Sequence, residues 1–432
     1  MIAANLEIRG ADLYFAGRRT ADLAARYGTP LYVMDEATVR RNCRRYRDAM
    51  RAAFGENALP LYASKACCFK ELYRIVGSEG LGADVVSSGE IYTAREAGFD
   101  LAKTYFHSNG KTDDDIRFAL ECGVGHFVAD NAEELTALSQ IAAEQGKTQA
   151  VLLRVTPGID PHTYEAVNTG RVDSKFGAPI ETGAAMALTK LALSLPGIAL
   201  TGFHCHVGSQ LFDSDVLIRS ADVMLRFIAD VKAVCGYEAS ELDLGGGYGV
   251  RYVESDPVLD LEENIRLVAQ RFHAVCADLG IAEPAVRLEP GRSIVADAGL
   301  TLYRVQSVKR IEGYKNYVAV DGGMGDNPRY ALYRSLYTVV AADRADEPCD
   351  FVCDLAGRCC ESGDLLRRDA ALPAGIGRGD LIAVLTTGAY NYSMSSNYNR
   401  LPRPPVVLLR EDGSEFIAVK GETFADLIRN DG

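Results

Sequence analysis

Apolar and polar positions follow one repeated unit along the chain from residue 61 onward. A short apolar run of strand character is followed by a segment of helical period and then by a glycine. This alternation predicts parallel strands joined by helices, which is an α/β fold. The predicted strands are Leu61–Lys65, Ala83–Ser87, Thr104–Asn109, His126–Asp130, Ala150–Thr156, Leu200–Val207, Glu241–Gly245 and Ala285–Glu289.

The segments between these strands carry helix start and stop signals. The first has apolar residues spaced i, i+3, i+4, i+7, as on a face that packs on a sheet: Phe69, Leu72, Tyr73 and Val76. Glycines suited to C-terminal caps are Gly80, Gly98, Gly123 and Gly146. Capping-box spacing predicts helix starts at Ser87 with Glu90, Thr112 with Asp115 and, more loosely, Asp130 with Glu133.

The number of predicted strands matches a closed (β/α)8 barrel of the TIM type, although an open doubly wound sheet shows the same alternation. The positions of the polar residues favour the barrel, because its strand C-terminal ends converge on one mouth. The long loop Pro157–Pro179 is expected on that same mouth. The polar residues at or just past strand ends are Lys65, His107, Arg154, His206, Gly245–Gly247 and Glu289.

The pattern changes after about residue 293 to short β-rich runs separated by turn residues, with no long helix. We therefore expect a barrel domain over residues 36–293 and an antiparallel β-domain, sandwich-like or barrel-like, built from residues 1–35 and 294–432. Its predicted strands are Leu13–Phe15, Leu31–Met34, Thr301–Val308, Tyr317–Asp321, Tyr337–Ala341, Phe351–Leu355, Leu381–Thr386, Val406–Leu409 and Phe416–Val419.

Composition narrows the class of protein. The formal net charge of −13 disfavours partners that carry phosphate backbones or anionic lipid, so we expect neither nucleic-acid nor membrane binding. The longest stretch without a charged residue, Leu191–Phe212, contains Pro196, three Gly and two His, which argues against a bilayer span. The N-terminus lacks a signal-peptide pattern, and eleven Cys without CxxC spacing fit independent thiols. We expect a cytoplasmic enzyme.

Two segments at the predicted mouth suit a phosphate group. Gly245-Gly246-Gly247 follows a strand, where backbone N–H groups can approach a phosphate, although a tight turn explains these glycines equally well. Glu289-Pro290-Gly291-Arg292 follows the next strand and adds a guanidinium. Barrels commonly bind phosphate at the loops after their seventh and eighth strands, so together the two segments favour a phosphate site.

Lys65 closes the first predicted barrel strand. A lysine amine at a barrel mouth can form a Schiff base with an aldehyde, and an ion pair with Asp84 or Glu289 is the structural alternative. A lysine facing a phosphate site suggests pyridoxal 5'-phosphate (PLP) as cofactor. Glu289 could then pair with the pyridine nitrogen, and His206 could stack on the ring. Metal binding by His204 and His206 is disfavoured, because no third ligand is evident.

The motifs of the chain resemble those of the diaminopimelate decarboxylases, which belong to the alanine-racemase-like, fold-type-III PLP enzymes. The lysine, HxGS, GGG and EPGR elements are shared with ornithine and arginine decarboxylases, whereas DSKFG and SMSSNYN point to the diaminopimelate enzymes. The matching segments are YASKA around Lys65, DSKFG at 173–177, GFHCHVGSQ at 202–210, DLGGGYG at 243–249, EPGR at 289–292, PRYALY at 328–333, CESGD at 360–364 and GAYNYSMSSNYN at 388–399.

The resemblance implies a role for each matching residue. Lys65 would hold the cofactor, Asp84 would orient the lysine or histidine, His206 would stack on the ring, and Glu289 would pair with its nitrogen. The phosphate would be bound by Ser209, Gly245, Gly246, Gly247, Glu289, Pro290, Gly291, Arg292 and Tyr390. The substrate would meet Arg292, Arg329, Tyr333, Glu361 and Tyr390, with Cys360 as the proton donor. No metal is implied.

The substrate implied by the resemblance is meso-2,6-diaminopimelate, which would lose CO2 to give L-lysine. Its distal amino-acid head needs an arginine for the carboxylate and an acid for the ammonium, and Arg329 and Glu361 are of those types. Alternatives are a sibling decarboxylase for ornithine, arginine, lysine or a carboxylated polyamine, a non-catalytic PLP-binding homologue, and an unrelated phosphate-binding barrel.

The resemblance also implies a homodimer with shared active sites, because the CESGD segment would come from the partner subunit. The chain departs from the family pattern at Cys67, Gly325 and Arg358-Cys359. None of these positions has a proposed contact with cofactor or substrate. We interpret Cys67, Cys68 and Cys359 as buried small hydrophobic residues.

Overall fold

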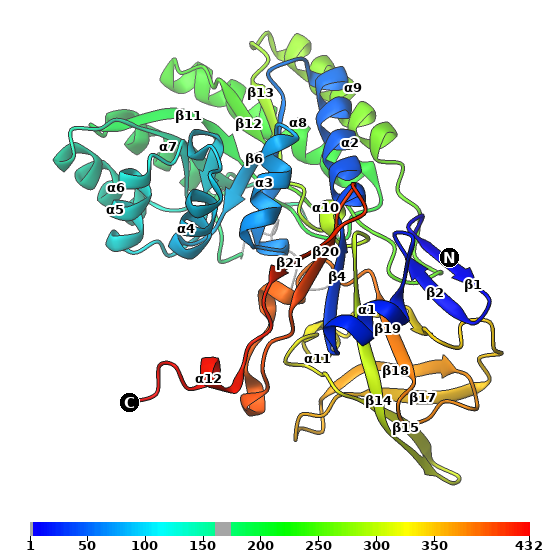
Figure 1. The fold of residues 1–432 in the computed structure, drawn as a ribbon. Helices are drawn as coiled ribbons and strands as arrows, with labels where there is room; N and C mark the ends of the chain where they lie inside the picture. Colours follow the sequence, from blue (N-terminus) through cyan, green and yellow to red (C-terminus); the bar gives the residue numbers. More distant parts are fainter. Residues whose placement is uncertain (1–2, 160–173) are drawn as a thin grey trace. The chain divides into compact units, whose positions relative to one another are not determined.

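The computed structural model describes residues 3–159 and 174–432, which divide into two compact units (Figure 1). The barrel unit comprises Asn42–Gly249 and Val258–Ser293, and the β unit comprises Met1–Arg41, Val250–Pro257 and Ile294–Gly432. The first boundary falls within helix α2 (Glu36–Phe54).

The barrel unit is built around a closed ring of parallel strands. The ring runs in the order β9, β11, β12, β13, β5, β6, β7, β8 and closes through pairing of β8 with β9, while the short β10 (Ala178–Pro179) extends β9. The predicted barrel is confirmed, and the open sheet is excluded. The strands are β5 (Leu59–Ala63), β6 (Gly82–Val85), β7 (Thr104–Phe106), β8 (His126–Ala129), β9 (Gln149–Thr156), β11 (Ile198–His204), β12 (Glu241–Asp243) and β13 (Ala285–Leu288).

Helices follow the barrel strands and bury their apolar faces. The predicted face of α3 is confirmed, since Phe69, Leu72, Tyr73 and Val76 are all buried. The remaining barrel helices begin after the predicted strands, as the alternation requires. The helices are α3 (Lys70–Ser78), α4 (Ser88–Ala97), α5 (Asp113–Cys122), α6 (Ala132–Glu144), α7 (Ala184–Ser194), α8 (Ser214–Cys235), α9 (Leu261–Leu279) and the short α10 (Arg292–Val295).

Two of the three predicted helix starts are confirmed. Ser87 caps α4 by accepting from the Glu90 N–H, and Thr112 and Asp115 form a full capping box on α5. The third is wrong by one residue: Asn131 caps α6 by accepting from the Glu134 N–H, while Asp130 Oδ1 accepts from Gly177 N over 2.9 Å. The glycines predicted to end α3 to α6 all have positive φ; Gly98 and Gly123 are the caps, and Gly80 and Gly146 come one residue later.

The β unit contains a mostly antiparallel sheet in the order β18-β17-β15-β14-β4-β20-β21, with β19 also paired to β14 and β16 paired to β19. Two of its pairs, β15–β17 and β4–β20, are parallel. Strand β18 was not predicted, because charged residues interrupt its apolar pattern. The strands are β4 (Leu31–Asp35), β14 (Gly299–Ile311), β15 (Lys315–Val320), β16 (Val339–Ala341), β17 (Phe351–Ala356), β18 (Leu365–Leu372), β19 (Leu381–Leu385), β20 (Val406–Leu409) and β21 (Glu415–Val419).

The remaining elements of the β unit are small. A three-stranded sheet joins β1 (Leu6–Arg9), β2 (Asp12–Phe15) and β3 (Arg18–Arg19), and α1 (Thr20–Tyr27) follows it. Later helices are short, as predicted: α11 (Arg329–Tyr333) and α12 (Phe424–Leu427). The apolar core of this unit joins residues of the first strands to residues of the last ones, including Leu13, Val33, Leu302 and Val407. The N-terminal segment therefore packs within this unit.

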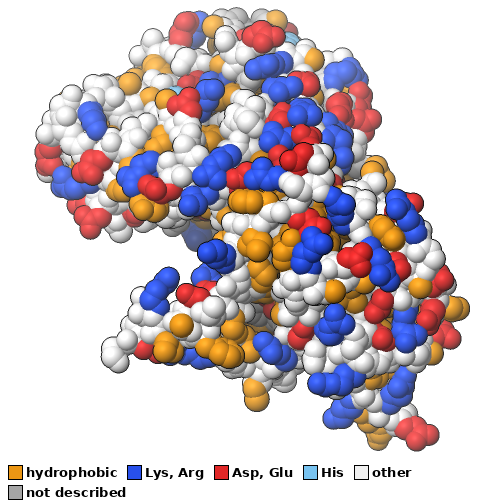
Figure 2. Space-filling view, in the orientation of Figure 1, with side chains coloured by type: hydrophobic (Ala, Val, Ile, Leu, Met, Phe, Trp, Pro, Cys, Tyr) orange, Lys and Arg blue, Asp and Glu red, His pale blue; other side chains and the backbone are white. Residues whose placement is uncertain are grey.

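The surface carries charges of both signs. On the face shown in Figure 2, acidic and basic side chains are interspersed. No helix in the described ranges is long and apolar enough to cross a membrane.

Candidate active site

Lys65 lies just past β5, in a short 3-10 turn (Ser64–Ala66). Its Nζ is 3.4 Å from Asp84 Oδ2 on the neighbouring strand β6, so the ion pair considered as the structural alternative is present, with Asp84 as the partner. The lysine side chain is 43% exposed whereas Asp84 is 1% exposed. Ser64 Oγ donates to the Asp84 carbonyl over 2.9 Å and ties the turn to β6. The structure thus holds an accessible amine against a buried carboxylate.

The three glycines after β12 stand where side chains do not fit. A Cβ on Gly246 would lie 2.1 Å from the Glu289 carbonyl oxygen, and one on Gly247 would lie 2.4 Å from the Gly208 carbonyl oxygen. Gly245 and Gly247 have φ of +70° and +121°, which L side chains rarely adopt. Gly246 N donates to His206 Nδ1 over 3.2 Å. The backbone here is bare and closely packed, as a phosphate cradle requires.

The EPGR segment joins this cradle to the lysine turn. Glu289 N donates to the Gly245 carbonyl over 2.9 Å, and Ala63 N donates to the Pro290 carbonyl over 3.1 Å. Arg292 Nη2 donates to Ser209 Oγ over 2.9 Å, which brings two predicted phosphate-binding residues together. A Cβ on Gly291 would lie 2.9 Å from Ala63, so glycine is needed where this segment packs on β5.

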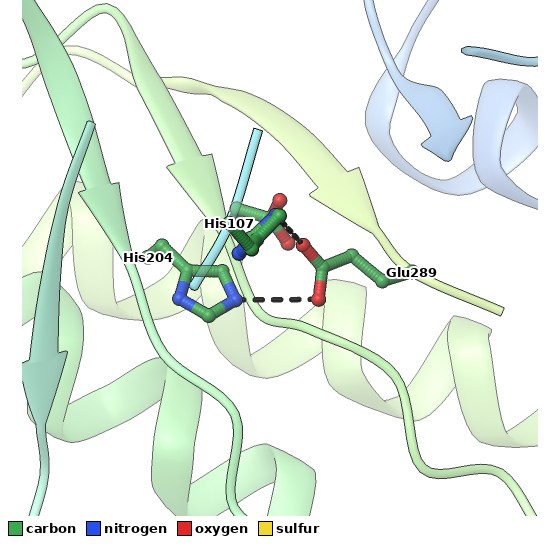
Figure 3. A group of neighbouring side chains, drawn as sticks. His107, His204 and Glu289 are labelled. Carbon is green, nitrogen blue, oxygen red and sulfur yellow. Dashed lines mark hydrogen bonds and ion pairs between the residues drawn. The ribbon is translucent and has the colours of Figure 1, made fainter. Parts of the chain in front are cut away.

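A buried cluster of His107, His204, Asp243 and Glu289 occupies the strand ends beside these segments. Figure 3 shows the Glu289 carboxylate between the two imidazoles: Oε1 is 2.7 Å from His107 Nε2, and Oε2 is 3.3 Å from His204 Nε2. The ligand atoms of all four residues lie within 4.8 Å of one another. The prediction that His204 has no third ligand for a metal site was wrong, because His107, Asp243 and Glu289 surround it. These groups come from the ends of other strands, and Asp243 stands directly opposite His204 where β12 pairs with β11.

Burial shifts the pKa values of the ionisable groups in this cluster. It lowers the pKa of His204 to about 4, and it lowers the pKa of His206 well below its usual value. Burial, and then the charge of Glu289, raise the pKa of Asp243 well above its usual value. Burial alone would also raise the pKa of Glu289, but His107 and His204 outweigh it and hold this pKa well below its usual value. The pKa values of these two neighbouring acids are therefore shifted in opposite directions.

In the β unit, Arg329 on α11 is enclosed by aromatic rings. Its guanidinium carbon lies 5.1 Å from the ring centre of Tyr333 and 5.1 Å from that of Tyr390. Tyr390 has φ +62°, an uncommon conformation for a non-glycine residue that often marks functional sites. Arg329 is 7% exposed, and Nη2 donates to Ser335 Oγ over 3.4 Å. Within the described ranges, no carboxylate pairs with this guanidinium, and its Nε has no hydrogen-bond partner.

The CESGD segment follows β17 in the same unit. Asp364 accepts from Cys359 N over 2.7 Å and from Met324 N over 2.6 Å, and Cys360 N donates to Asn399 Oδ1 over 2.7 Å. Cys360 and Glu361 are exposed, whereas Cys359 is buried. Backbone hydrogen bonds therefore hold this segment with its two predicted functional side chains accessible.

The predicted residues fall into one group on each unit. The barrel unit brings Lys65, Asp84, His206, Ser209, Gly245–Gly247 and Glu289–Arg292 to the strand ends, and the β unit holds Arg329, Tyr333, Cys360, Glu361 and Tyr390. Asp173 and most of the predicted loop Pro157–Pro179 lie outside the described residues. Sequence reasoning missed Asp243, although its position as the last residue of β12 is the same signal that selected the other mouth residues.

Comparison with known proteins identifies the class. Residues 36–296 match the family model described as "Pyridoxal-dependent decarboxylase, pyridoxal binding domain". The chain is thus a decarboxylase of the PLP-dependent class, and the predicted cofactor is confirmed.

Relatives that match along the whole chain narrow the class to one family. The diaminopimelate decarboxylase of Bacillus subtilis (strain 168) is 42% identical over 99% of this chain and 95% of its own, and that of Staphylococcus aureus (strain COL) is 40% identical over 98% of each. The crystal structure of the M. jannaschii diaminopimelate decarboxylase in complex with L-lysine is 33% identical, with a TM-score of 0.93 over 100% of this chain and 98% of that one. The chain belongs to the diaminopimelate decarboxylase family, as the motifs predicted.

The residues at the barrel mouth fit PLP. Gly245–Gly247 have no room for side chains, which fits a backbone that approaches a phosphate closely. An accessible amine is present at Lys65. The buried atoms Asp84 Oδ1, Asp243 Oδ2 and His204 Nδ1 have no hydrogen-bond partner among the described residues, so this mouth has polar capacity left for a ligand.

Proposed function

We propose that this protein catalyses the decarboxylation of meso-2,6-diaminopimelate to L-lysine and CO2, as a cytoplasmic enzyme of lysine biosynthesis. The observation that carries the substrate assignment is the buried guanidinium of Arg329, which has no acidic partner among the described residues. A buried cation is costly unless an anion meets it. The distal carboxylate of diaminopimelate supplies that anion, whereas ornithine lacks one.

In the barrel unit we assign the cofactor-binding roles. Lys65 holds PLP through its amine, and Asp84 Oδ2, 3.4 Å from that amine, orients it. Ser209, Gly245–Gly247 and the backbone of Glu289–Arg292 receive the phosphate. The carboxylate of Glu289 keeps a proton on the pyridine nitrogen, and His206 packs on the ring. When bound, PLP supplies the aldehyde that takes the substrate amine and the ring that accepts the electrons released with CO2.

In the β unit we assign the substrate-binding roles. Arg329 pairs with the distal carboxylate, with Tyr333 and Tyr390 excluding water around it, and Arg292 of the barrel unit also meets the substrate. Glu361 accepts hydrogen bonds from the distal ammonium. Cys360 gives its thiol proton to the α-carbon from which CO2 has left. Tyr390 also contributes to the phosphate end.

We further propose an assembly, since residues 36–293 would act as the PLP-binding domain and residues 1–35 and 294–432 as the domain that contributes to the dimer interface. Two chains would form a homodimer with shared active sites, in which the CESGD segment of each subunit completes the partner's site. The exposure of Cys360 and Glu361 in the single chain supports this assignment.

The proposed function is tested by supplying the purified chain with PLP and measuring lysine and CO2 formed from meso-diaminopimelate beside ornithine, arginine, lysine and a carboxylated polyamine. We expect turnover of diaminopimelate and a visible absorption band that disappears in Lys65→Ala. Turnover of another substrate alone would overturn the substrate, and a band that persists in Lys65→Ala would overturn the role of the lysine. A band without any turnover would indicate a non-catalytic homologue.

The substrate assignment has its own variant. Arg329→Met should lower kcat/KM for diaminopimelate by about 100-fold, because a buried charge-assisted contact is lost. Arg334→Met removes an exposed arginine one residue past α11 and is the matched control, which should leave kcat/KM unchanged. Equal effects of the two variants would contradict the role of Arg329.

A further inference from the structure

The carboxylate of Glu289 meets an imidazole at each of its oxygens. His107 Nε2 lies 2.7 Å from Oε1, and His204 Nε2 lies 3.3 Å from Oε2. The two rings stand edge to face with their centres 4.8 Å apart. All three side chains are at most 5% exposed, so water competes little for these contacts. Each carboxylate oxygen retains a second lone pair for another donor.

His107 also links Glu289 to the lysine turn. Its Nε2 is 3.7 Å from Asp84 Oδ1, while the other oxygen of Asp84 is 3.4 Å from Lys65 Nζ. A continuous series of charged and polar atoms therefore runs from the amine of Lys65 through Asp84 and His107 to Glu289 and His204. Asp84, which contacts the amine of Lys65, and Glu289, which would pair with the ring nitrogen of PLP, therefore share the imidazole of His107.

The surroundings of Asp243 and Glu289 shift the pKa values of these two acids in opposite directions. Asp243 adjoins Glu289, and two buried carboxylates side by side do not both ionise readily. The imidazoles contact Glu289, and the pKa directions of the two acids differ accordingly: that of Glu289 is lowered and that of Asp243 is raised. The titratable and charged groups around Glu289 are Lys65, Asp84, His107, Arg154, His204, Cys205, His206 and Asp243.

We propose that His107 and His204 are positioning residues that hold the Glu289 carboxylate in place and ionised for the ring nitrogen of PLP. This inference rests on the proposed role of Glu289. With a pKa lowered to about 4, His204 is neutral at neutral pH and has one ring proton. Its Nδ1 has no hydrogen-bond partner among the described residues, so that proton belongs on Nε2, where it faces Glu289. An ionised Glu289 keeps the ring nitrogen protonated, whereas a neutral one does not.

A divalent metal ion is the competing occupant, because two imidazoles and two carboxylates form a plausible ligand set. The distances favour the hydrogen-bonding network. The two imidazoles contact the two oxygens of Glu289 directly, at 2.7 and 3.3 Å, which are distances of hydrogen-bonded or nearly hydrogen-bonded groups. The experiment below separates the two.

The test measures PLP affinity of the apoenzyme by equilibrium binding, together with the pH dependence of the visible absorption of bound PLP. His107→Leu and His204→Leu should each weaken PLP binding by about 10-fold or more and shift the pH profile, because a contact to a buried charge is lost. His107→Gln and His204→Gln retain an N–H near the Nε2 position and should restore binding to within about 3-fold.

The matched control is His126→Leu. His126 pairs with Glu241 over 3.2 Å and stacks on Tyr105, but it lies at the N-terminal end of β8, away from the strand ends that carry the mouth residues. This variant should leave PLP affinity and the pH profile unchanged. Thermal unfolding of every apo variant by circular dichroism shows which of them are folded.

A double-mutant cycle with Glu289→Gln keeps the inference falsifiable if the leucine variants are destabilised. In the Glu289→Gln background, His107→Leu and His204→Leu should cause no further shift of the pH profile, because the carboxylate through which they act is absent. Leucine variants that match His126→Leu, or additive effects in the cycle, would overturn the inference and leave the proposed function standing. A stoichiometric metal ion retained by the wild type and lost in His107→Leu would also overturn it. A wild-type chain that does not bind PLP would overturn both.

Discussion

Cys359 and Cys360 are neighbours in the chain with opposite surroundings. Cys359 is buried, and burial raises the pKa of its thiol to about 11. Cys360 is exposed, and its backbone N–H is held by Asn399. A proton donor has to reach the substrate, so the exposed thiol is the one suited to catalysis. The interpretation of Cys67 and Cys359 as buried residues is confirmed, whereas Cys68 is only partly buried.

Replacing the exposed thiol therefore tests the proton donor. Cys360→Ala should lower kcat by about 100-fold or more, since a positioned general acid is lost, while PLP binding is unchanged. The measurement is steady-state lysine formation with the visible absorption of bound PLP recorded in parallel. Cys349→Ala removes another exposed thiol of the same unit and should retain full activity. Unchanged turnover in Cys360→Ala would assign the proton donor to another group.

The buried His204 makes stability depend on pH. Its pKa is about 4 in the folded chain and about 6.5 in an unfolded one, because burial disfavours the charged ring. As pH falls below 6.5, the unfolded state binds a proton that the folded state excludes, so the free energy of unfolding decreases until about pH 4. His204→Gln should remove about 2 kcal/mol of the loss between pH 7 and pH 5.

Chemical denaturation at each pH, followed by circular dichroism because the chain has no Trp, measures this difference. His273 provides a control of opposite sign. Its pKa is raised by hydrogen bonds to Ala53 and Glu283 that outweigh burial, so its contribution is present at low pH and lost as pH rises. Its exposed position makes that effect small. If the free energy of unfolding of His204→Gln falls with pH as steeply as that of the wild type, this pH dependence does not come from His204.

Residue types at strand ends were predictable, but their pairings were not. Lys65, His107 and Glu289 were selected because each follows an apolar run. That His107 meets Glu289 depends on barrel closure, since β7 and β13 are separated in the ring by β5 and β6. No local sequence pattern contains information on the distance between His107 and Glu289. The same reason explains why His204 was considered with His206, its neighbour in sequence, and not with Glu289.

At the level of elements, a buried ion pair connects the segments that follow β7 and β8. Lys111 Nζ donates to Glu134 Oε1 on α6 over 2.7 Å and to the Val128 carbonyl on β8 over 2.9 Å. Glu134 Oε2 accepts from Asp130 N over 3.2 Å. Burial lowers the pKa of Lys111 and raises that of Glu134, so each charge depends on the other. The pair fixes the loop that leads from His107 into α5.

Breaking the ion pair between Lys111 and Glu134 should destabilise the folded chain. Lys111→Met leaves the Glu134 carboxylate buried without its cation, and we expect a loss of about 3–5 kcal/mol in the free energy of unfolding. Urea denaturation followed by circular dichroism gives the value. The double variant Lys111→Met/Glu134→Leu should recover most of the loss, and Lys190→Met, at an exposed lysine of α7, should change stability by about 0.5 kcal/mol or less. If Lys111→Met is as stable as this control, the charges of Lys111 and Glu134 do not depend on each other.

Element boundaries followed the apolar runs closely, and the errors have local causes. Seven of the eight predicted barrel strands ended one to three residues too late, because the polar residues just past them were included in the runs, whereas Ala150–Thr156 ended at the observed residue. Strand β18 was missed since Arg367, Arg368 and Asp369 interrupt its apolar residues, which is common where one face of a strand meets water. The order and direction of the strands in the β unit depend on pairings between the two chain ends, and the sequence pattern contains no signal for those.

At the level of the whole molecule, charge and length constrained the class but not the function. The net charge of −13 is spread among interspersed side chains on the face in Figure 2, and the chemistry depends on a few buried groups in each unit. Lys65, the proposed PLP-binding residue, and Cys360, the proposed proton donor, belong to different units of one chain. In the proposed homodimer, the Cys360 of each subunit serves the Lys65 of the partner, and a prediction about assembly follows from this.

Mixing two inactive chains tests the shared sites directly. In a heterodimer of Lys65→Ala with Cys360→Ala, one site has lost both residues and the other has kept both. Random assembly makes about half of the dimers mixed, so about a quarter of wild-type activity should return after co-refolding or co-expression. The mass of the active species, measured by light scattering, should be twice the 46.7 kDa of the chain. Each variant refolded alone is the control. A mixture as inactive as these controls would place Lys65 and Cys360 of one site on the same chain, and the proposal of shared sites would be wrong.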